Sequence, residues 1–120
     1  MQIACHKKKD TLVVEMEGEL DHHTANAVRD RLDSILDDAS IKNMVIDLKK
    51  LKFMDSSGIG VFIGRYKNIA QRGGIIAVAQ VTPQIHKILE VSGLYRIIRK
   101  YISVQEALTD LGGAINNEYY

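Results

Sequence analysis

The sequence has little of several residue types, and each shortage limits what the protein can be. Cys5 is the only cysteine among 120 residues, so no disulfide can form within the chain and a reducing cytoplasm is the expected setting. No apolar run approaches the roughly 20 residues that cross a bilayer. The first residues also lack an apolar stretch of signal-peptide length. We therefore expect a soluble protein that stays inside the cell.

An excess of positive charge is also missing. Sixteen Lys and Arg stand against 15 Asp and Glu, which leaves a net charge of +1. This balance argues against a nucleic-acid binder with a broad basic face. We interpret the short basic clusters at residues 7–9 and 49–50 as solvated edges or turns. A composition of 46% hydrophobic and 26% charged residues is typical of one compact domain.

Hydrophobic periodicity predicts strands and helices in alternation. A hairpin comes first, and strand–helix units follow it, which predicts an α/β fold with a mixed, mostly parallel sheet and about four helices. Strands are expected at residues 2–7, 11–17, 44–48, 75–79 and 96–99, and helices at 21–36, 57–72, 83–91 and 104–111. Asp21 is expected to open the first helix, Pro83 the third, and Gly112-Gly113 to end the last. The domain spans residues 1–113, and residues 114–120 are expected to form a mobile tail.

The most informative segment lies between a predicted strand and a predicted helix, at residues 53–60. Loops at the carboxyl ends of parallel strands commonly carry functional groups in α/β domains. The first N–H groups of a helix lack internal partners, so this position would hold a phosphate well. Asp and Ser are also common helix caps, and Asp55-Ser56-Ser57-Gly58 could do no more than start the helix.

The two serines of this segment are not equivalent. Placed at the N-cap, Ser56 has a non-helical backbone and can turn its hydroxyl to solvent, whereas Ser57 falls in the first turn and faces the sheet. Ser56 is therefore the better phosphoryl acceptor. A shift of one residue in the helix boundary would reverse this assignment.

Other kinds of site are less well supported by the sequence. A dinucleotide-binding G-x-G-x-x-G loop would need glycine at position 63, which is Ile63. We interpret Gly60 and Gly64 as letting the helix lie close to the sheet. No G-x-S-x-G elbow surrounds Ser56, so no catalytic residues and no enzymatic activity are expected.

A metal site at the paired histidines is not expected either. His22 and His23 follow Asp21, but adjacent helical residues point about 100° apart, so they would rarely share one ion. The spacing of His86 and Glu90 allows a pair on a helix surface and carries no functional weight alone.

Three stretches together resemble the STAS (sulfate transporter and anti-sigma factor antagonist) domain family, in particular the sporulation antagonists of anti-sigma F factor. They are residues 18–25, 53–61 and 64–67, and the likeness covers nearly the whole chain. The resemblance implies partner switching. The unphosphorylated antagonist binds a dimeric anti-sigma factor that is also a serine kinase, and thereby frees the sigma factor. The kinase uses Mg-ATP to phosphorylate the serine that corresponds to Ser56, and a metal-dependent serine phosphatase reverses this.

The resemblance also implies roles for neighbouring residues. Asp21 would meet a basic residue of the kinase, and Ser57, Gly58 and Ile59 would lie at the contact. The chain itself would need no cofactor or metal and would bind neither nucleic acid nor membrane. A monomer is the default expectation. Alternatives that stay open are a general stress-response antagonist of the same family, a nucleotide-binding STAS module, and a regulatory domain in which Asp-Ser-Ser-Gly is only a cap.

Overall fold

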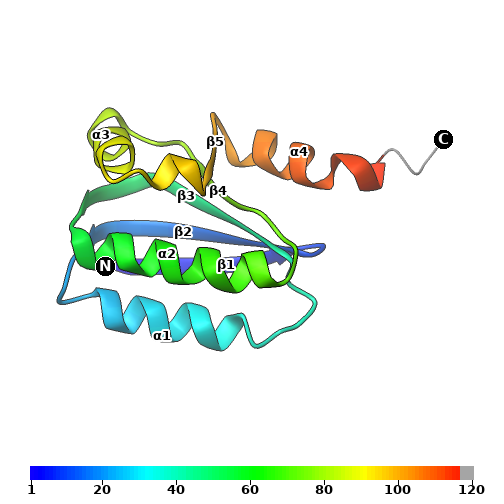
Figure 1. The fold of residues 1–120 in the computed structure, drawn as a ribbon, viewed down its shortest axis with the longest axis horizontal. Helices are drawn as coiled ribbons and strands as arrows, with labels where there is room; N and C mark the ends of the chain where they lie inside the picture. Colours follow the sequence, from blue (N-terminus) through cyan, green and yellow to red (C-terminus); the bar gives the residue numbers. More distant parts are fainter. Residues whose placement is uncertain (117–120) are drawn as a thin grey trace.

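The computed structural model describes residues 1–116, with side chains to residue 112, and has a five-stranded sheet at its centre (Figure 1). The strand order is β1-β2-β3-β4-β5, with β1 antiparallel to β2 and the other neighbours parallel. The α/β fold and the opening hairpin are therefore confirmed. The elements are β1 (Gln2–Lys8), β2 (Thr11–Leu20), α1 (Ala25–Ile35), β3 (Asn43–Met54), α2 (Ser56–Gln71), β4 (Ile76–Ala79), α3 (Pro83–Val91), the 3-10 helix η1 (Leu94–Arg96), β5 (Arg99–Tyr101) and α4 (Val104–Asn116).

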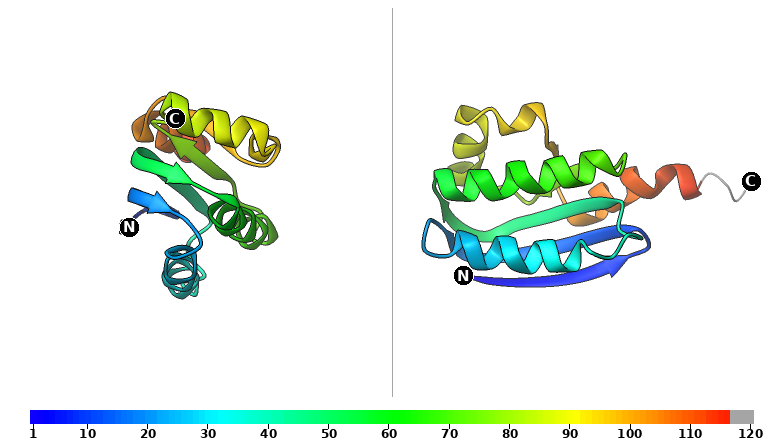
Figure 2. Two further views of the ribbon diagram at one scale, coloured as in Figure 1. Left: turned by 90° about the vertical axis from the view of Figure 1, so that its left-hand side faces the viewer. Right: turned by 60° about the horizontal axis from the view of Figure 1, so that its bottom comes forward.

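The core has two layers on opposite faces of the sheet. Helices α1 and α2 lie side by side over one face, where Ile46 of β3 is fully buried (Figure 2). Helix α4 covers part of the other face, where its Ala107 packs against Val45 and Ala77. Residues 43–48 are buried throughout, as expected for a central parallel strand covered on both faces. Among the described residues, no helix combines the length and the apolarity that crossing a membrane requires.

Several predicted boundaries are wrong, and β3 runs on to Met54 although the prediction ends it at residue 48. Helix α1 begins at Ala25, because Asp21 caps a separate turn before it. The predicted strand at 96–99 is mostly the 3-10 helix η1 and its exit, and β5 begins only at Arg99. Helix α4 passes through Gly112 and Gly113 to Asn116, since a glycine lowers helix stability by only about 1 kcal/mol. Of the predicted mobile tail, residues 117–120 lie outside the described part of the chain.

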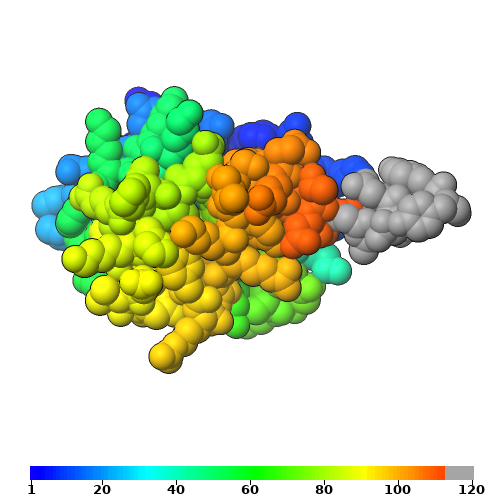
Figure 3. Space-filling view, turned by 90° about the horizontal axis from the view of Figure 1, so that it is seen from above, coloured from blue at the N-terminus to red at the C-terminus, as the bar shows by residue number. Residues whose placement is uncertain are grey.

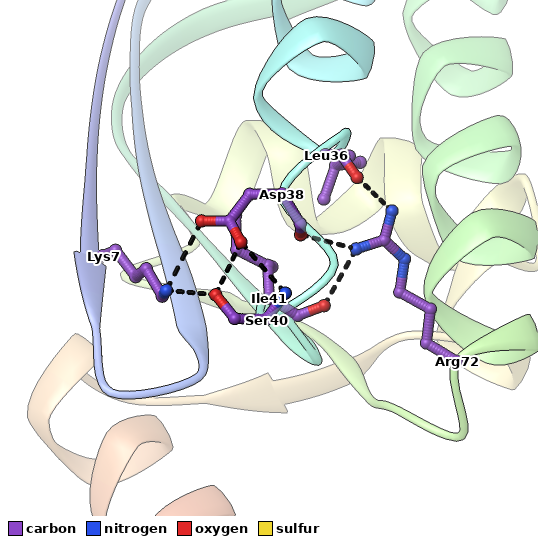
Figure 4. A network of polar contacts seen from close by, with 6 residues as sticks. All are labelled: Lys7, Leu36, Asp38, Ser40, Ile41 and Arg72. Carbon is purple, nitrogen blue, oxygen red and sulfur yellow. Dashed lines mark hydrogen bonds and ion pairs between the residues drawn. The ribbon is translucent and has the colours of Figure 1, made fainter.

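A single arginine holds the connection between α1 and β3 (Figure 4). Arg72, just after α2, donates through Nη1 to the carbonyl oxygens of Asp38 at 3.1 Å and Ile41 at 2.9 Å. Its Nη2 donates to the carbonyl oxygen of Leu36. The Asp38 carboxylate also pairs with Lys7 of β1 at 3.4 Å. This network lies where α1 and α2 end, and it fixes those ends to each other and to the sheet.

Candidate functional site

The candidate site forms where two parallel strands end together. Leu20, the last residue of β2, is paired with Met54, the last residue of β3. The turn at residues 21–24 and the start of α2 therefore lie side by side, and the N–H of Asp55 donates to the carbonyl oxygen of Leu20 at 3.3 Å. The strand register thus brings together the two predicted parts of the site, which are more than 30 residues apart in the sequence.

Asp55 is the residue that caps α2 and joins the two turns. Its Oδ1 accepts hydrogen bonds from the N–H groups of Ser57 at 2.9 Å and Gly58 at 3.3 Å. Its Oδ2 accepts one from the N–H of His22 at 3.1 Å. The predicted N-cap, Ser56, is therefore wrong by one residue. A carboxylate has two oxygens and a full charge, so it can serve the helix dipole and the neighbouring turn at once.

Ser56 is the first residue of α2, and its side chain is exposed, whereas Ser57 is half-buried. The predicted difference in accessibility between the two serines therefore holds, although its reason has changed. Ser56 is left free for the solvent because Asp55 takes the capping position. Its role as a phosphoryl acceptor stays a prediction.

The helix start does not offer the phosphate cradle that the sequence suggested. The N–H groups of Ser57 and Gly58 already donate to Asp55, and the carboxylate occupies the place where an anion would be held. A phosphate on Ser56 would have to share these donors with a negative charge next to it. Repulsion then opposes the attraction of the helix dipole.

Asp21 is held in an ordered turn beside Asp55. Its Oδ1 accepts hydrogen bonds from the N–H groups of His23 at 2.9 Å and Thr24 at 3.2 Å. The Thr24 hydroxyl in turn donates to the carbonyl oxygen of Glu19 at 2.9 Å. Desolvation by itself would raise the pKa of Asp21, but these hydrogen bonds outweigh it, and the pKa is lowered. Asp21 therefore carries its negative charge at neutral pH.

Gly58 and Ile59, also predicted at the contact, face the core more than the solvent. Gly58 is buried, and an added Cβ would lie 2.5 Å from Cγ of Met54 and 2.7 Å from the carbonyl oxygen of Leu20. Only glycine lets α2 start this close to the strand ends. Ile59 is partly buried and packs against the core. A direct contact of either residue with a partner stays a prediction.

Two further glycines of α2 are placed differently from the prediction. The sequence suggested that Gly60 and Gly64 bring the helix close to the sheet. In the structure, Gly60 is exposed and Gly64 half-buried, and an added Cβ at either would meet nothing within 4 Å. Packing inside the domain does not explain these glycines.

Sequence reasoning missed an exposed aromatic next to the site. Phe53, two residues before the cap, is 38% exposed and is paired with Glu19 across β2 and β3. The available signal was strand alternation, since Met54 points into the core and its neighbour must then point out. Phe53 adds an apolar element to a surface that is otherwise polar.

The paired histidines also differ from their prediction. His22 and His23 precede α1 instead of lying on it, and their ring centroids are 3.9 Å apart. Within the part of the chain that the structure describes, no three His, Cys, Asp or Glu side chains are grouped as a metal site would require.

Comparison with known proteins agrees with the fold. The STAS domain model matches residues 2–107. An anti-sigma F factor antagonist of Paenibacillus polymyxa is 44% identical, over 92% of this chain and 95% of the relative. The phosphorylated form of Bacillus SpoIIAA has a similar fold, with a TM-score of 0.72 at 24% identity over 91% of this chain and 98% of that one. A putative anti-sigma factor antagonist from Thermotoga maritima gives 0.83 at 21% identity over 91% and 93%. The chain therefore belongs to the STAS domain family and is a homologue of its anti-sigma factor antagonists.

Proposed function

We propose that the unphosphorylated protein binds an anti-sigma factor that is also a serine kinase, and so releases a sigma factor in the cytoplasm. Phosphorylation of Ser56 by this kinase ends the binding, and a serine phosphatase restores it. The protein acts as a monomer, by binding and not by catalysis, and Mg-ATP is used by the kinase alone. The observation that carries the proposal is an exposed Ser56 hydroxyl next to the ordered carboxylate of Asp55.

The proposed switch depends on charge at a closely packed contact. A phosphate adds roughly −1.5 to −2 charge at neutral pH. It would stand beside Asp55, whose carboxylate already takes the nearest N–H groups. Docking would bury both charges in a less polar environment, where desolvation costs more and repulsion is stronger. A loss of about 3 kcal/mol would weaken binding more than a hundredfold.

The proposed contact surface extends from Ser56 to the neighbouring turn. Asp21 is ionised there and would pair with a basic group of the kinase. Ser57, Gly58 and Ile59 would lie against the partner, with the exposed ring of Phe53 at the edge of the surface. Aromatic side chains are enriched among the residues that contribute most to binding energy at interfaces. Phe53 is therefore the first residue of this surface to replace by alanine in a binding measurement.

The target is proposed to be the anti-sigma F factor of sporulation, since a relative with that name is 44% identical over nearly its whole length. A nucleotide-binding role at the start of α2 has no comparable support, because Asp55 occupies the N–H groups that a phosphate would need. Binding measured side by side to an anti-sigma F and an anti-sigma B factor would test the assignment. Equal or tighter binding to the anti-sigma B factor would refute it.

Intact-mass analysis and site mapping after incubation with ATP and the kinase test the switch directly. We expect one phosphate, on Ser56, and none in Ser56→Ala. Ser56→Ala should still bind the kinase, and Ser56→Asp should bind poorly. Ser34→Ala, at an exposed serine of α1, is the matched control and should behave as wild type. Phosphate on another residue, or full binding by Ser56→Asp, would contradict the proposal.

A further inference from the structure

The sheet has an open outer edge at β1. This strand is the first in the order β1-β2-β3-β4-β5, so within residues 1–116 no strand pairs with its outer side. Figure 3 shows the N-terminal residues, in blue, along part of the upper margin of the molecule, on the side away from α3, in yellow. An edge strand presents N–H and C=O groups with which a strand of another chain can pair.

The outward backbone groups of β1 belong to Ile3, Cys5 and Lys7. Nη1 of Arg31, on α1, donates to the carbonyl oxygen of Ile3 at 2.6 Å, so this carbonyl points away from β2. Positions that bond to the partner strand alternate with positions that do not, so the groups of Cys5 and Lys7 point outward as well. A guanidinium only donates hydrogen bonds, so Arg31 cannot serve the outward N–H groups.

Contacts near both ends of β1 hold the edge in place. At one end Met1 lies close to Gly18 of β2, where an added Cβ would be 3.2 Å from Cα of Met1. At the other end Nζ of Lys7 pairs with the Asp38 carboxylate at 3.4 Å and donates to the hydroxyl of Ser40. A binding edge that is ordered in advance loses less entropy when a partner strand is added.

A groove of about 510 Å³ lies beside this edge, between β1 and α1. We call it the β1 groove, and its apolar lining comes from Met1, Ile3, Ala27 and Val28. Val28 is buried, and Ile3 is half-buried and packs against the core. Side chains of a strand alternate between its two faces, so every second side chain of an added strand would enter the groove. The groove therefore favours apolar residues at those positions.

The other side chains of an added strand would meet positive charge. Residues 1–9 include three lysines and no acidic residue. His6 and Lys8 are exposed on the face of β1 opposite the groove. Two glutamates share that face, Glu15 and Glu17, but they lie on β2, one strand further from the edge. Opposite charges on neighbouring strands attract, so the edge favours acidic residues at the remaining positions of a partner strand.

We propose that the β1 edge binds an extended, acidic segment of a partner protein, which adds a strand antiparallel to β1. Main-chain hydrogen bonds to the outward groups supply affinity, and alternate side chains supply specificity. The apolar side chains fill the β1 groove, and an acidic side chain pairs with Lys8. Antiparallel pairing is the more stable arrangement per residue. The groove reaches His23 and Thr24 but not Ser56, so this binding does not depend on phosphorylation.

The probe is the peptide Glu-Val-Glu-Val-Glu-Val-Glu with blocked ends, titrated into the whole unphosphorylated protein at pH 7.5 and followed by NMR. We expect saturable binding with a Kd of about 1 mM or below, and shifts of amide signals at residues 2–8 and 27–31. Methylation of the three Val nitrogens, which would face β1, should weaken binding roughly tenfold or more. Methylation of three Glu nitrogens, which would face away, should change it by less than about threefold.

Variants of the protein test the edge and its charge separately. Cys5→Pro removes an outward N–H that pairing with β2 does not use, and should weaken binding by roughly tenfold. Lys8→Glu should weaken binding by roughly threefold or more. Lys52→Glu, the same change of charge at an exposed site of β3, should leave it within about twofold of wild type. Circular dichroism checks that each variant is folded.

Several outcomes would overturn the proposal. They are equal binding of a Lys-Val-Lys-Val-Lys-Val-Lys peptide, full binding of the peptide methylated on its Val nitrogens, and shifts centred on residues 53–59. Concentration-dependent shifts of residues 3–7 without peptide would instead assign the edge to a second copy of this chain. Sedimentation with phosphatidylglycerol vesicles, without binding of the acidic peptide, would assign it to an anionic membrane. Ser56→Asp should bind the peptide as wild type does, which keeps this test separate from that of the proposed function.

Discussion

Asp55 is the residue on which the geometry of the candidate site depends most. One oxygen caps α2 and the other binds the N–H of His22, so a single carboxylate sets the relative positions of the helix start and the turn before α1. Sequence reasoning found the motif and the exposure of Ser56. It missed the role of Asp55, because both Asp and Ser are good caps and only the backbone decides which of them precedes the first helical residue.

Asp55→Ala should lower the free energy of unfolding by about 1–2 kcal/mol, since a cap is lost and the His22 N–H loses its acceptor. Asp55→Asn keeps one acceptor oxygen and should lose about half as much. Urea unfolding followed by circular dichroism measures both. Asp30→Ala, at an exposed position of α1, is the control. A loss below about 0.3 kcal/mol in Asp55→Ala would mean that the cap contributes little.

Asp21 should make stability depend on pH in a defined direction. Its pKa is lowered in the folded state, because hydrogen bonds from His23 and Thr24 outweigh desolvation. Its contribution is therefore present above the unfolded-state pKa of about 3.9 and is lost as pH falls through the lower folded-state value. We expect Asp21→Asn to be less stable than wild type at pH 7, with the difference shrinking below pH 4. Unfolding curves at both pH values measure this, and a difference that does not vary with pH would contradict it.

At the scale of elements, periodicity predicted all the long strands and helices, because each buries a regular apolar face. The failures are short or lie at ends. Residues 94–96 form a 3-10 helix in a segment anchored by the buried Leu94 and Ile98, and a short apolar run does not distinguish this from a strand. Gly112-Gly113 is a typical signal for the end of a helix, but these two glycines do not end α4, because the helical turns around them are stable enough to continue.

The glycines of α2 should respond to alanine in opposite ways. Gly60→Ala should raise the free energy of unfolding by about 0.5–1 kcal/mol, because helix propensity improves and the new Cβ meets nothing within 4 Å. Gly58→Ala should lower it by about 1–3 kcal/mol, because the Cβ would lie 2.7 Å from the carbonyl oxygen of Leu20. Chemical denaturation of the two variants measures the contrast. Similar effects in both would show that the close approach at Gly58 is relieved by a small shift of the helix.

At the scale of the whole molecule, phosphorylation of Ser56 has two opposing effects on the free energy of unfolding of the domain. The dipole of α2 favours a negative charge at Ser56, and the carboxylate of Asp55 opposes it. Because Asp55 already takes the N–H groups of Ser57 and Gly58, we expect repulsion to win. The fold itself should persist, since α2 is anchored along its length by buried residues such as Phe62 and Ile69.

The phosphorylated protein should therefore melt a few degrees below the unphosphorylated form at pH 7.5, for a loss of about 1 kcal/mol. The difference should narrow at pH 5, where the phosphate, with a second pKa of about 6, carries less charge. It should also narrow in Asp55→Asn, which removes the opposing charge. Differential scanning calorimetry of both forms measures these shifts. A higher melting temperature after phosphorylation would show that attraction by the helix dipole is the larger force.

The three carbonyl oxygens bound by Arg72 have a consequence for the encounter with a partner. Through them, Arg72 joins α1 and α2 at the ends remote from Ser56. Asp55 joins the near ends, so the two helices are held together at both ends. We expect such a pair, held at both ends, to meet a partner as a rigid body. Its association rate should then be limited by diffusion and orientation, with no slow rearrangement of the helices after first contact.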